Sequence, residues 1–159
     1  MTNASDLTRR RHRPIGVAAV ALLVLYAVAF PLQAQPARYE IDPDHLSIGF
    51  LVDHVGYSKV LGMFRKAEGS YVFDEETGEL SDLRVIVDTA SVFTNHQKRD
   101  EHLKSADFLN SAEFPRMTFA AAGARRTGER EYLIDGDLEI LGKRQPVTLQ
   151  ATWNKSGEY

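Results

Sequence analysis

Hydrophobic and polar residues alternate with a period of two along most of residues 45–154. The clearest run places Leu46, Ile48, Phe50 and Val52 on one face of an extended chain. The same alternation recurs at residues 83–87, 117–121, 132–140 and 147–153. Buried parallel strands are apolar on both faces, whereas this pattern is typical of antiparallel strands with one dry face. The sequence therefore predicts an all-β antiparallel fold.

Polar segments that favour turns separate the alternating runs. They occupy residues 74–78, 125–130 and 142–143, and each contains a glycine. Several strands joined by short turns predict a meander sandwich or a barrel. We expect two strands, residues 60–73 and 132–141, to be long and to curve at the internal glycines 62, 69 and 136, since glycine in a strand often marks a bulge or a corner.

One segment interrupts the β pattern. Thr94 and Gln97 have the spacing of a capping box, in which two side chains satisfy backbone N–H groups at the start of a helix. Residues 98–104 then predict a helix, and the segment has an apolar side made by Leu103, Phe108, Leu109 and Phe114. We expect this short helical insert to pack over one mouth of the β structure.

The first 34 residues differ in composition from the rest. Four arginines between residues 9 and 13 precede an apolar run over residues 15–30, a layout typical of a secretory signal peptide. The run is shorter than the roughly 20 residues that a membrane-spanning helix needs. Cleavage after Ala34 and retention as an N-terminal membrane anchor both remain open. Either one sends residues 35–159, the folded domain, across the membrane, so we expect a periplasmic or secreted protein close to a membrane.

Charge argues against nucleic-acid binding. Residues 35–159 contain 15 basic and 21 acidic residues, which gives a net charge of −6 with histidine neutral. Affinity for nucleic acid comes mostly from neutralised phosphates, and the sequence has no basic stripe to neutralise them. The chain contains no cysteine, so disulfides and zinc–thiolate sites are excluded.

A polar cluster in the predicted helix is the main candidate for chemistry. His96 and Asp100 are i,i+4 neighbours, so the carboxylate could orient the imidazole or both could touch a metal. The other interpretations are ordinary surface pairs, or a structural role in which Arg99 or Asp100 fixes the helix. His96 and His102 lie on different helix faces, unlike the histidine pair of a zinc protease. We expect a structural contribution and no bound metal.

Familiar catalytic motifs are absent from the sequence. There is no Gly-x-Ser-x-Gly elbow for a serine nucleophile and no glycine-rich loop that opens a helix to bind phosphate. These absences argue against the corresponding enzyme classes only. We expect a protein that is not an enzyme and that uses no cofactor.

Several short motifs are more specific in their order and spacing than any of them is alone. Residues 94–109 contain Thr94-Asn95, then Arg99-Asp100-Glu101-His102-Leu103-Lys104-Ser105 and Asp107-Phe108-Leu109. Further motifs are Tyr39-Glu40-Ile41-Asp42, Val60-Leu61-Gly62-Met63-Phe64, Gly136-Asp137-Leu138 and Pro146-Val147. Together they resemble the YceI-like family, exported lipocalin-like proteins associated with polyisoprenoid binding, over residues 39–154.

This resemblance implies an extended antiparallel lipocalin-like β-barrel with a short helical insert. Such a barrel has an elongated apolar pore that holds an isoprenoid-type molecule, and the family supplies no established catalytic residues. The family usually continues past Trp153 with at least one more strand pair, whereas this chain stops at Tyr159. We therefore expect a C-terminally truncated barrel with exposed strand edges.

The leading hypothesis is a periplasmic carrier for an isoprenoid, quinone-like or other long-chain apolar lipid. Inward-parity residues and the apolar side of the insert would contact that lipid, namely Phe50, Val52, Phe64, Val85, Leu103, Phe108, Phe119, Ile134 and Leu138. The structural motif of the insert comprises Thr94, Arg99, Asp100 and His102. The alternative is a structural or partner-binding β-domain that serves a membrane electron-transfer or stress system without a free ligand. The oligomeric state stays open, a dimer included.

Overall fold

The computed structural model describes residues 35–157, which form a mostly β unit with one α-helix. Its strands are β1 Ala37–Glu40, β2 Ile48–His54, β3 Ser58–Phe64, β4 Ala67–Asp74, β5 Glu79–Asp88, β6 Val92–Phe93, β7 Arg116–Gly123, β8 Arg125–Arg126, β9 Glu131–Ile140 and β10 Lys143–Thr152. A short 3-10 helix, η1 (Thr89–Ser91), precedes β6, and α2 (Gln97–Lys104) follows it. The expected signal peptide or anchor, residues 1–34, lies outside the described residues. In the described part of the chain, no helix is long and apolar enough to cross a membrane.

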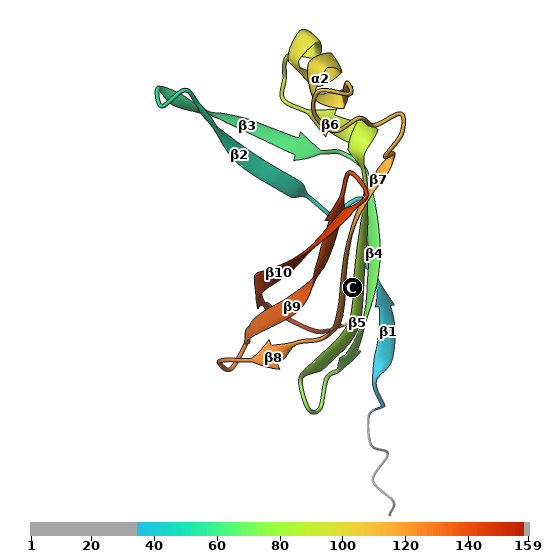
Figure 1. Cartoon of the computed structure of the whole chain (residues 1–159). Helices are drawn as coiled ribbons and strands as arrows, with labels where there is room; N and C mark the ends of the chain where they lie inside the picture. The colour runs from blue at the N-terminus through green and yellow to red at the C-terminus, as the bar shows by residue number, and fades with distance from the viewer. Residues whose placement is uncertain (1–34, 158–159) are drawn as a thin grey trace, which may run out of the picture. The chain divides into compact units, whose positions relative to one another are not determined.

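The larger sheet is antiparallel and follows the order β1-β4-β5-β7-β9-β10, with β8 paired to β9 (Figure 1). One face of its central strands carries the apolar residues that the period-two pattern selects. Val87, Met117, Phe119 and Ile134 on that face are all buried. The predicted antiparallel, mostly β fold with a helical insert is confirmed.

The smaller sheet contains β2, β3 and β6 in that order. All seven residues of β2 pair with β3, whereas β3 pairs with β6 only through Met63 and Phe64. In Figure 1 the closed end of the β2–β3 hairpin points away from the larger sheet. The hairpin is therefore tied to the rest of its sheet at one end only.

The predicted single strand over residues 60–73 is wrong. β3 ends at Phe64 in the smaller sheet, and β4 begins at Ala67 in the larger one. Ser91 fixes the corner, since its carbonyl oxygen accepts the Arg65 N–H (3.1 Å) and its hydroxyl accepts the Lys66 N–H (3.1 Å). These bonds satisfy backbone groups that a continuous strand would give to its neighbour, so the chain changes sheets here.

The predicted strand over residues 132–141 is observed as β9, which pairs along its length with β10. Leu141 and Gly142 form the two-residue turn between them, with φ angles of 54° and 67°. A turn with two positive φ angles matches the twist of the strands that it joins. Pro146 fits β10 because that strand is the end of the sheet, where a missing N–H is tolerated.

A β-bulge in β5 lies opposite one of the predicted bend points in β4. The pairing of the two strands shifts register between Ser70 and Val72, next to Gly69, and the extra residue lies in β5, where Asp82 has a φ of 48°. A Cβ atom added at Gly69 would lie 2.6 Å from the carbonyl oxygen of Arg84, so only glycine allows this approach of the two strands. The bulge increases the local twist of the sheet.

The buried core of the larger sheet consists of Phe73, Phe119, Ala121, Tyr132 and Ile134. Trp153 packs against it with its ring centroid 5.0 Å from that of Phe73, edge to face. The buried Tyr132 hydroxyl donates to the carbonyl oxygen of Gly78 (2.8 Å), which satisfies its polar end. These core side chains fill one part of the space that the strands enclose, and a cavity occupies another part.

The described strands do not close into one barrel. Over residues 35–157, β1 and β10 end the larger sheet and β2 and β6 end the smaller one, and no strand pairing joins the two sheets. Both sheets thus have open edges in this part of the chain. An antiparallel fold is established here, and barrel closure is not.

Candidate functional site

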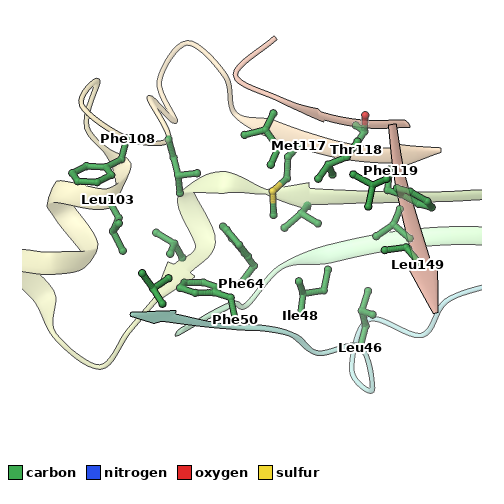
Figure 2. Close-up of a pocket in the computed structure, with 18 residues that line it drawn as sticks. Leu46, Ile48, Phe50, Phe64, Leu103, Phe108, Met117, Thr118, Phe119 and Leu149 are labelled. Carbon is green, nitrogen blue, oxygen red and sulfur yellow. The ribbon is translucent and has the colours of Figure 1, made fainter. Parts of the chain in front are cut away.

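A cavity of about 750 Å³ lies between the smaller sheet and the larger one. Residues of α2 and of the turn that follows it also contribute to its wall, as Figure 2 shows for Leu103 and Phe108. The complete lining consists of Leu46, Ile48, Phe50, Val52, Phe64, Val85, Val87, Val92, Leu103, Phe108, Leu109, Met117, Thr118, Phe119, Leu138, Ile140, Val147 and Leu149.

The lining is almost wholly apolar. Thr118 carries the single polar side chain among the described lining residues, and none of these residues is ionisable. A polar ligand group would lose its water here and gain at most the Thr118 hydroxyl as a partner, which costs free energy. The volume falls within the range of about 300–1,000 Å³ that is usual for small-molecule sites. The cavity suits a molecule with a long apolar part.

Eight of the nine predicted ligand-binding residues line this cavity. They are Phe50, Val52, Phe64, Val85, Leu103, Phe108, Phe119 and Leu138. Strands of both sheets and the helical insert bring these side chains together although they are far apart in the sequence. Contact of these residues with a ligand stays a prediction.

Ile134 does not line the cavity. It shares the inward face of β9 with Leu138 but lies four residues away along the strand, in the buried cluster with Phe73 and Tyr132, and it is only 3% exposed. Alternation assigns a side chain to a face of the sheet and carries no information on its position along the strand. The pattern therefore could not separate core from cavity.

The sequence prediction omitted ten lining residues. Seven of them lie on the inward parity of their runs and could have been included: Leu46, Ile48, Val87, Met117, Ile140, Val147 and Leu149. Leu109 follows the helix and lies on the apolar side of the insert that the sequence indicates. The other two gave no such signal, since Val92 belongs to a two-residue strand and Thr118 to the polar parity of β7.

Gly62 makes room for an aromatic side chain in the cavity wall. It pairs with Phe50 across the β2–β3 hairpin, and a Cβ atom added at Gly62 would lie 2.2 Å from the Phe50 ring. The ring of Phe64 lies beside that of Phe50, with centroids 5.6 Å apart. This aromatic pair is the aromatic part of the wall that the smaller sheet contributes, beside Ile48, Val52 and Val92.

Asp100 holds the start of the insert in place. Its Oδ1 atom accepts both the backbone N–H (2.8 Å) and the hydroxyl (2.5 Å) of Thr94. Arg99 donates from Nε to the Thr94 hydroxyl oxygen and from Nη2 to the Thr94 carbonyl oxygen, both at 2.7 Å. Thr94 and Asp100 are buried, so these bonds satisfy groups that water does not reach. The geometry is that of a structural motif.

The predicted capping box is wrong. α2 spans Gln97–Lys104, and its N-cap is His96, whose Nδ1 atom accepts the N–H of Arg99 (3.3 Å). Thr94 is not the cap because its hydroxyl already bonds to Asp100 and Arg99. The Asp100 carboxylate likewise bonds to Thr94, which takes the place of the proposed pair with His96.

His102 supports the wall of the cavity from outside. Its ring meets the Phe108 ring edge to face at a centroid distance of 4.8 Å, and its Nε2 atom lies 3.4 Å from the Asp107 carboxylate. Phe108 in turn lines the cavity. Over residues 35–157, no group of three or more histidine, aspartate or glutamate side chains is placed to hold a metal ion.

The family model described as YceI-like domain matches residues 39–158. The chain belongs to the YceI-like family. The resemblance found in the sequence motifs is therefore confirmed. Among YceI-like proteins, Protein YceI of Escherichia coli is 42% identical to the chain over 120 residues, a match that covers 74% of this chain and 62% of that protein.

Solved structures of similar fold include a YCEI protein and a polyisoprenoid binding domain. The YCEI protein of Campylobacter jejuni is 32% identical, with a TM-score of 0.59 and coverage of 72% of this chain and 67% of that one. A polyisoprenoid binding domain from Saccharophagus degradans is 14% identical, with a TM-score of 0.58 and coverage of 73% and 66%. At that identity the second likeness concerns the fold alone. The YceI-like chain spans about two thirds of the length of these relatives.

Proposed function

We propose that this YceI-like chain is a carrier that holds an isoprenoid, quinone-like or other long-chain apolar lipid. The observation that carries the proposal is the 750 Å³ cavity, in which Thr118 is the single polar lining residue. The Saccharophagus degradans domain of similar fold is named for polyisoprenoid binding, which supports the same class of ligand.

Burial of the lipid chain supplies the binding free energy. Each buried methylene contributes about 0.8 kcal/mol, so ten of them contribute about 8 kcal/mol before the costs of association. The lining offers no partner for a charged or strongly polar head group. That end of the lipid stays in water at the mouth of the cavity, and selection acts on the length and shape of the chain.

Binding fits the cavity better than catalysis does. A catalytic site needs a nucleophile, an acid, a base or an electrophile within reach of the substrate. The lining offers one threonine hydroxyl and no ionisable side chain. The polar cluster of Thr94, Arg99 and Asp100 is occupied by its own hydrogen bonds.

The proposal includes the barrel and the location of the protein. A lipocalin-like barrel would form if the open edges of the two sheets close around the lipid, since a barrel of about eight strands leaves room for one small ligand. Residues 1–34 would act as a signal peptide or an anchor and send the domain to the periplasm or the exterior. The lipid would then be carried between or beside membranes.

Extraction tests the ligand directly. The full chain, purified without detergent and extracted with an apolar solvent, should release a long-chain lipid that mass spectrometry finds in near-stoichiometric amount. Protein stripped of this lipid should bind cis-parinaric acid, a fluorescent fatty acid. If it carries no apolar molecule and does not bind this probe, the carrier proposal fails and the structural or partner-binding alternative is favoured.

Val52 and Leu51 provide a matched pair of variants. Both are exposed residues of β2, but Val52 lines the cavity, whereas its neighbour Leu51 is not among the lining residues. Val52→Glu places an unpaired carboxylate against the bound chain and should weaken cis-parinaric acid binding at least tenfold. Leu51→Glu adds the same charge outside the cavity and should change affinity less than twofold. Equal effects of the two variants, both folded by circular dichroism, would place the ligand elsewhere.

A further inference from the structure

Exposed hydrophobic residues are concentrated on the β2–β3 hairpin. Eight large hydrophobic residues are exposed within residues 35–157, and six of them belong to this hairpin: Leu51, Val52, Val55, Tyr57, Leu61 and Met63. Scattered exposed hydrophobics are ordinary, but a contiguous group marks a surface that meets something apolar. The hairpin is therefore a candidate interaction surface.

The exposed residues surround the hairpin and do not form one flat patch. Leu51 and Leu61 pair across the strands on the face away from the cavity, and Val52 lies on the cavity face. Val55 and Tyr57, at 77% and 92% exposure, occupy the closed end. A protein partner covers one face of a hairpin, whereas lipid surrounds every side of an inserted tip. This distribution favours a lipid surface.

The turn at the closed end has an apolar residue where turn chemistry favours a polar one. Val55 has a φ of 48° and Gly56 a φ of 79°, and the Tyr57 N–H donates to the carbonyl oxygen of His54 (3.0 Å). Such turns favour asparagine, aspartate or glycine, and a β-branched residue at positive φ is an outlier. Strained positions of this kind concentrate at functional sites. Folding alone does not account for Val55.

Charge along the hairpin permits contact with a bilayer. Asp53 and Lys59 are its two formally charged residues, one of each sign, and they face each other at 4.0 Å. The described residues as a whole contain 15 basic and 20 acidic residues, a net charge of −5 with histidine neutral. The neutral hairpin thus matches an uncharged or zwitterionic lipid surface, and the Tyr57 ring suits the level of the lipid head groups.

A second copy of the chain is a poorer fit for this surface. A stable protein interface buries about 800 Å² on each partner and uses roughly 20–30 residues a side. β2 and β3 contribute seven residues each, and their exposed apolar side chains point in several directions. Insertion of a few side chains into lipid needs no such area.

We propose that the closed end of the β2–β3 hairpin inserts into the head-group layer of a zwitterionic lipid bilayer. Val52 belongs both to the exposed hairpin surface and to the cavity lining. Val52 consequently connects the exposed surface of the hairpin with the wall of the cavity. Docking itself goes beyond the carrier function and does not depend on it.

The tip can be measured site by site because the chain contains no cysteine. In a Ser58→Cys variant of the full chain, an environment-sensitive fluorophore sits one residue from Tyr57. A Thr127→Cys variant with the same label is the control, since Thr127 is exposed in the turn before β9. With phosphatidylcholine vesicles, the label at residue 58 should shift to the blue, and brominated lipid should quench it at least threefold more than the label at residue 127.

A charge at the tip separates docking from mere proximity to the membrane. Val55→Asp in the Ser58→Cys background should remove most of the quenching, and it suits the turn because aspartate tolerates positive φ. Thr127→Asp in the same background should leave quenching unchanged. Equal quenching at both labels, or no effect of Val55→Asp, would overturn the proposal. Burial of the label that depends on protein concentration, without vesicles, would overturn it in favour of a second copy. Neither result bears on cis-parinaric acid binding in the cavity.

Discussion

Thr94 is the residue through which the insert beside the cavity is held to the chain before it. It takes part in four hydrogen bonds, two to Asp100 and two from Arg99, and is 5% exposed. Buried polar groups are costly when they lose their partners and contribute modestly when they keep them. Removal of one partner should therefore lower the free energy of unfolding by more than the number of lost hydrogen bonds alone suggests.

Asp100→Ala should lower the free energy of unfolding by about 1–3 kcal/mol, because it leaves the Thr94 N–H and hydroxyl without their acceptor. Asp100→Asn keeps an acceptor oxygen and should cost less. Glu101→Ala is the control on the same helix, where loss of its bond from Gln97 should cost no more than about 0.5 kcal/mol. Urea unfolding followed by circular dichroism measures all three. An Asp100→Ala value equal to that of Glu101→Ala would contradict the structural role.

Tyr39 and Tyr71 should ionise at higher pH than ordinary tyrosines. The hydrogen bond from the Tyr39 hydroxyl to Glu75 (2.8 Å) raises the pKa of Tyr39, and burial raises the pKa of Tyr71. A raised folded-state pKa gives stability that is present below the ordinary value of about 10 and is lost as pH rises through the folded value. Absorbance titration at 295 nm, with Tyr39→Phe and Tyr71→Phe to assign the signals, measures both groups. Glu75→Ala should bring Tyr39 back toward its ordinary pKa and leave most of the Tyr71 shift, whereas equal changes would contradict these causes.

At the scale of strands and helices, the sequence predicts an element well where one of its faces is apolar and the other polar. β9 alternates from Ile134 to Ile140 and is observed almost as predicted. The break after Phe64 is invisible in the pattern because it depends on Ser91, which lies far along the chain and bonds to the corner. The predicted cap of α2 is wrong for a different reason, since Thr94 bonds to Asp100 and Arg99 within the helix and leaves the cap to His96.

In the candidate site, too, alternation predicts the face on which a side chain lies and does not predict how the sheets pack. Alternation selects the inward side chains, so six residues predicted from it reach the cavity, and Leu103 and Phe108 reach it from the apolar side of the insert. Whether an inward side chain lies in the core or in the cavity depends on how the sheets bend and pack. For this reason Ile134 lies in the core, and Phe119 contributes to core and cavity alike. The existence of a cavity is a property of that packing, and only the resemblance to a known family indicated it.

Close approach of two strands should make Gly136 intolerant of a side chain. A Cβ atom there would lie 2.6 Å from the Ala120 carbonyl oxygen and 2.6 Å from the Phe119 ring, whereas at Gly49 the nearest atom would be 3.8 Å away. Gly136→Ala should therefore lower stability by about 1–3 kcal/mol through overpacking, and Gly49→Ala should be neutral or slightly stabilising. Thermal unfolding compares the two variants. A smaller loss for Gly136→Ala than for Gly49→Ala would contradict the strand spacing.

Across the whole described unit, stability is unevenly distributed because the cavity separates the two sheets. β4, β5, β7 and β9 pair with neighbours on both sides and enclose the buried core. In the smaller sheet, the β2–β3 hairpin has an open edge at β2 and is joined to β6 by two residue pairs. Regions with few buried contacts and exposed backbone bonds open locally at lower free energy than the core does. The smaller sheet should therefore open first.

Hydrogen exchange measured by mass spectrometry tests this order and its dependence on ligand. Without lipid, amides of β2 and β3 should exchange at least tenfold faster than those of β5 and β7. A lipid bound in the cavity contacts both sheets. At a free concentration of 100 times its dissociation constant, it stabilises the folded protein by about 2.7 kcal/mol. Saturation with cis-parinaric acid should thus slow exchange in β2 and β3 most, because opening of that sheet releases the ligand. The same experiment on Val52→Glu at equal probe concentration should show little slowing. Uniform exchange in both sheets, or slowing confined to the larger one, would mean that the smaller sheet is not a wall of the binding site.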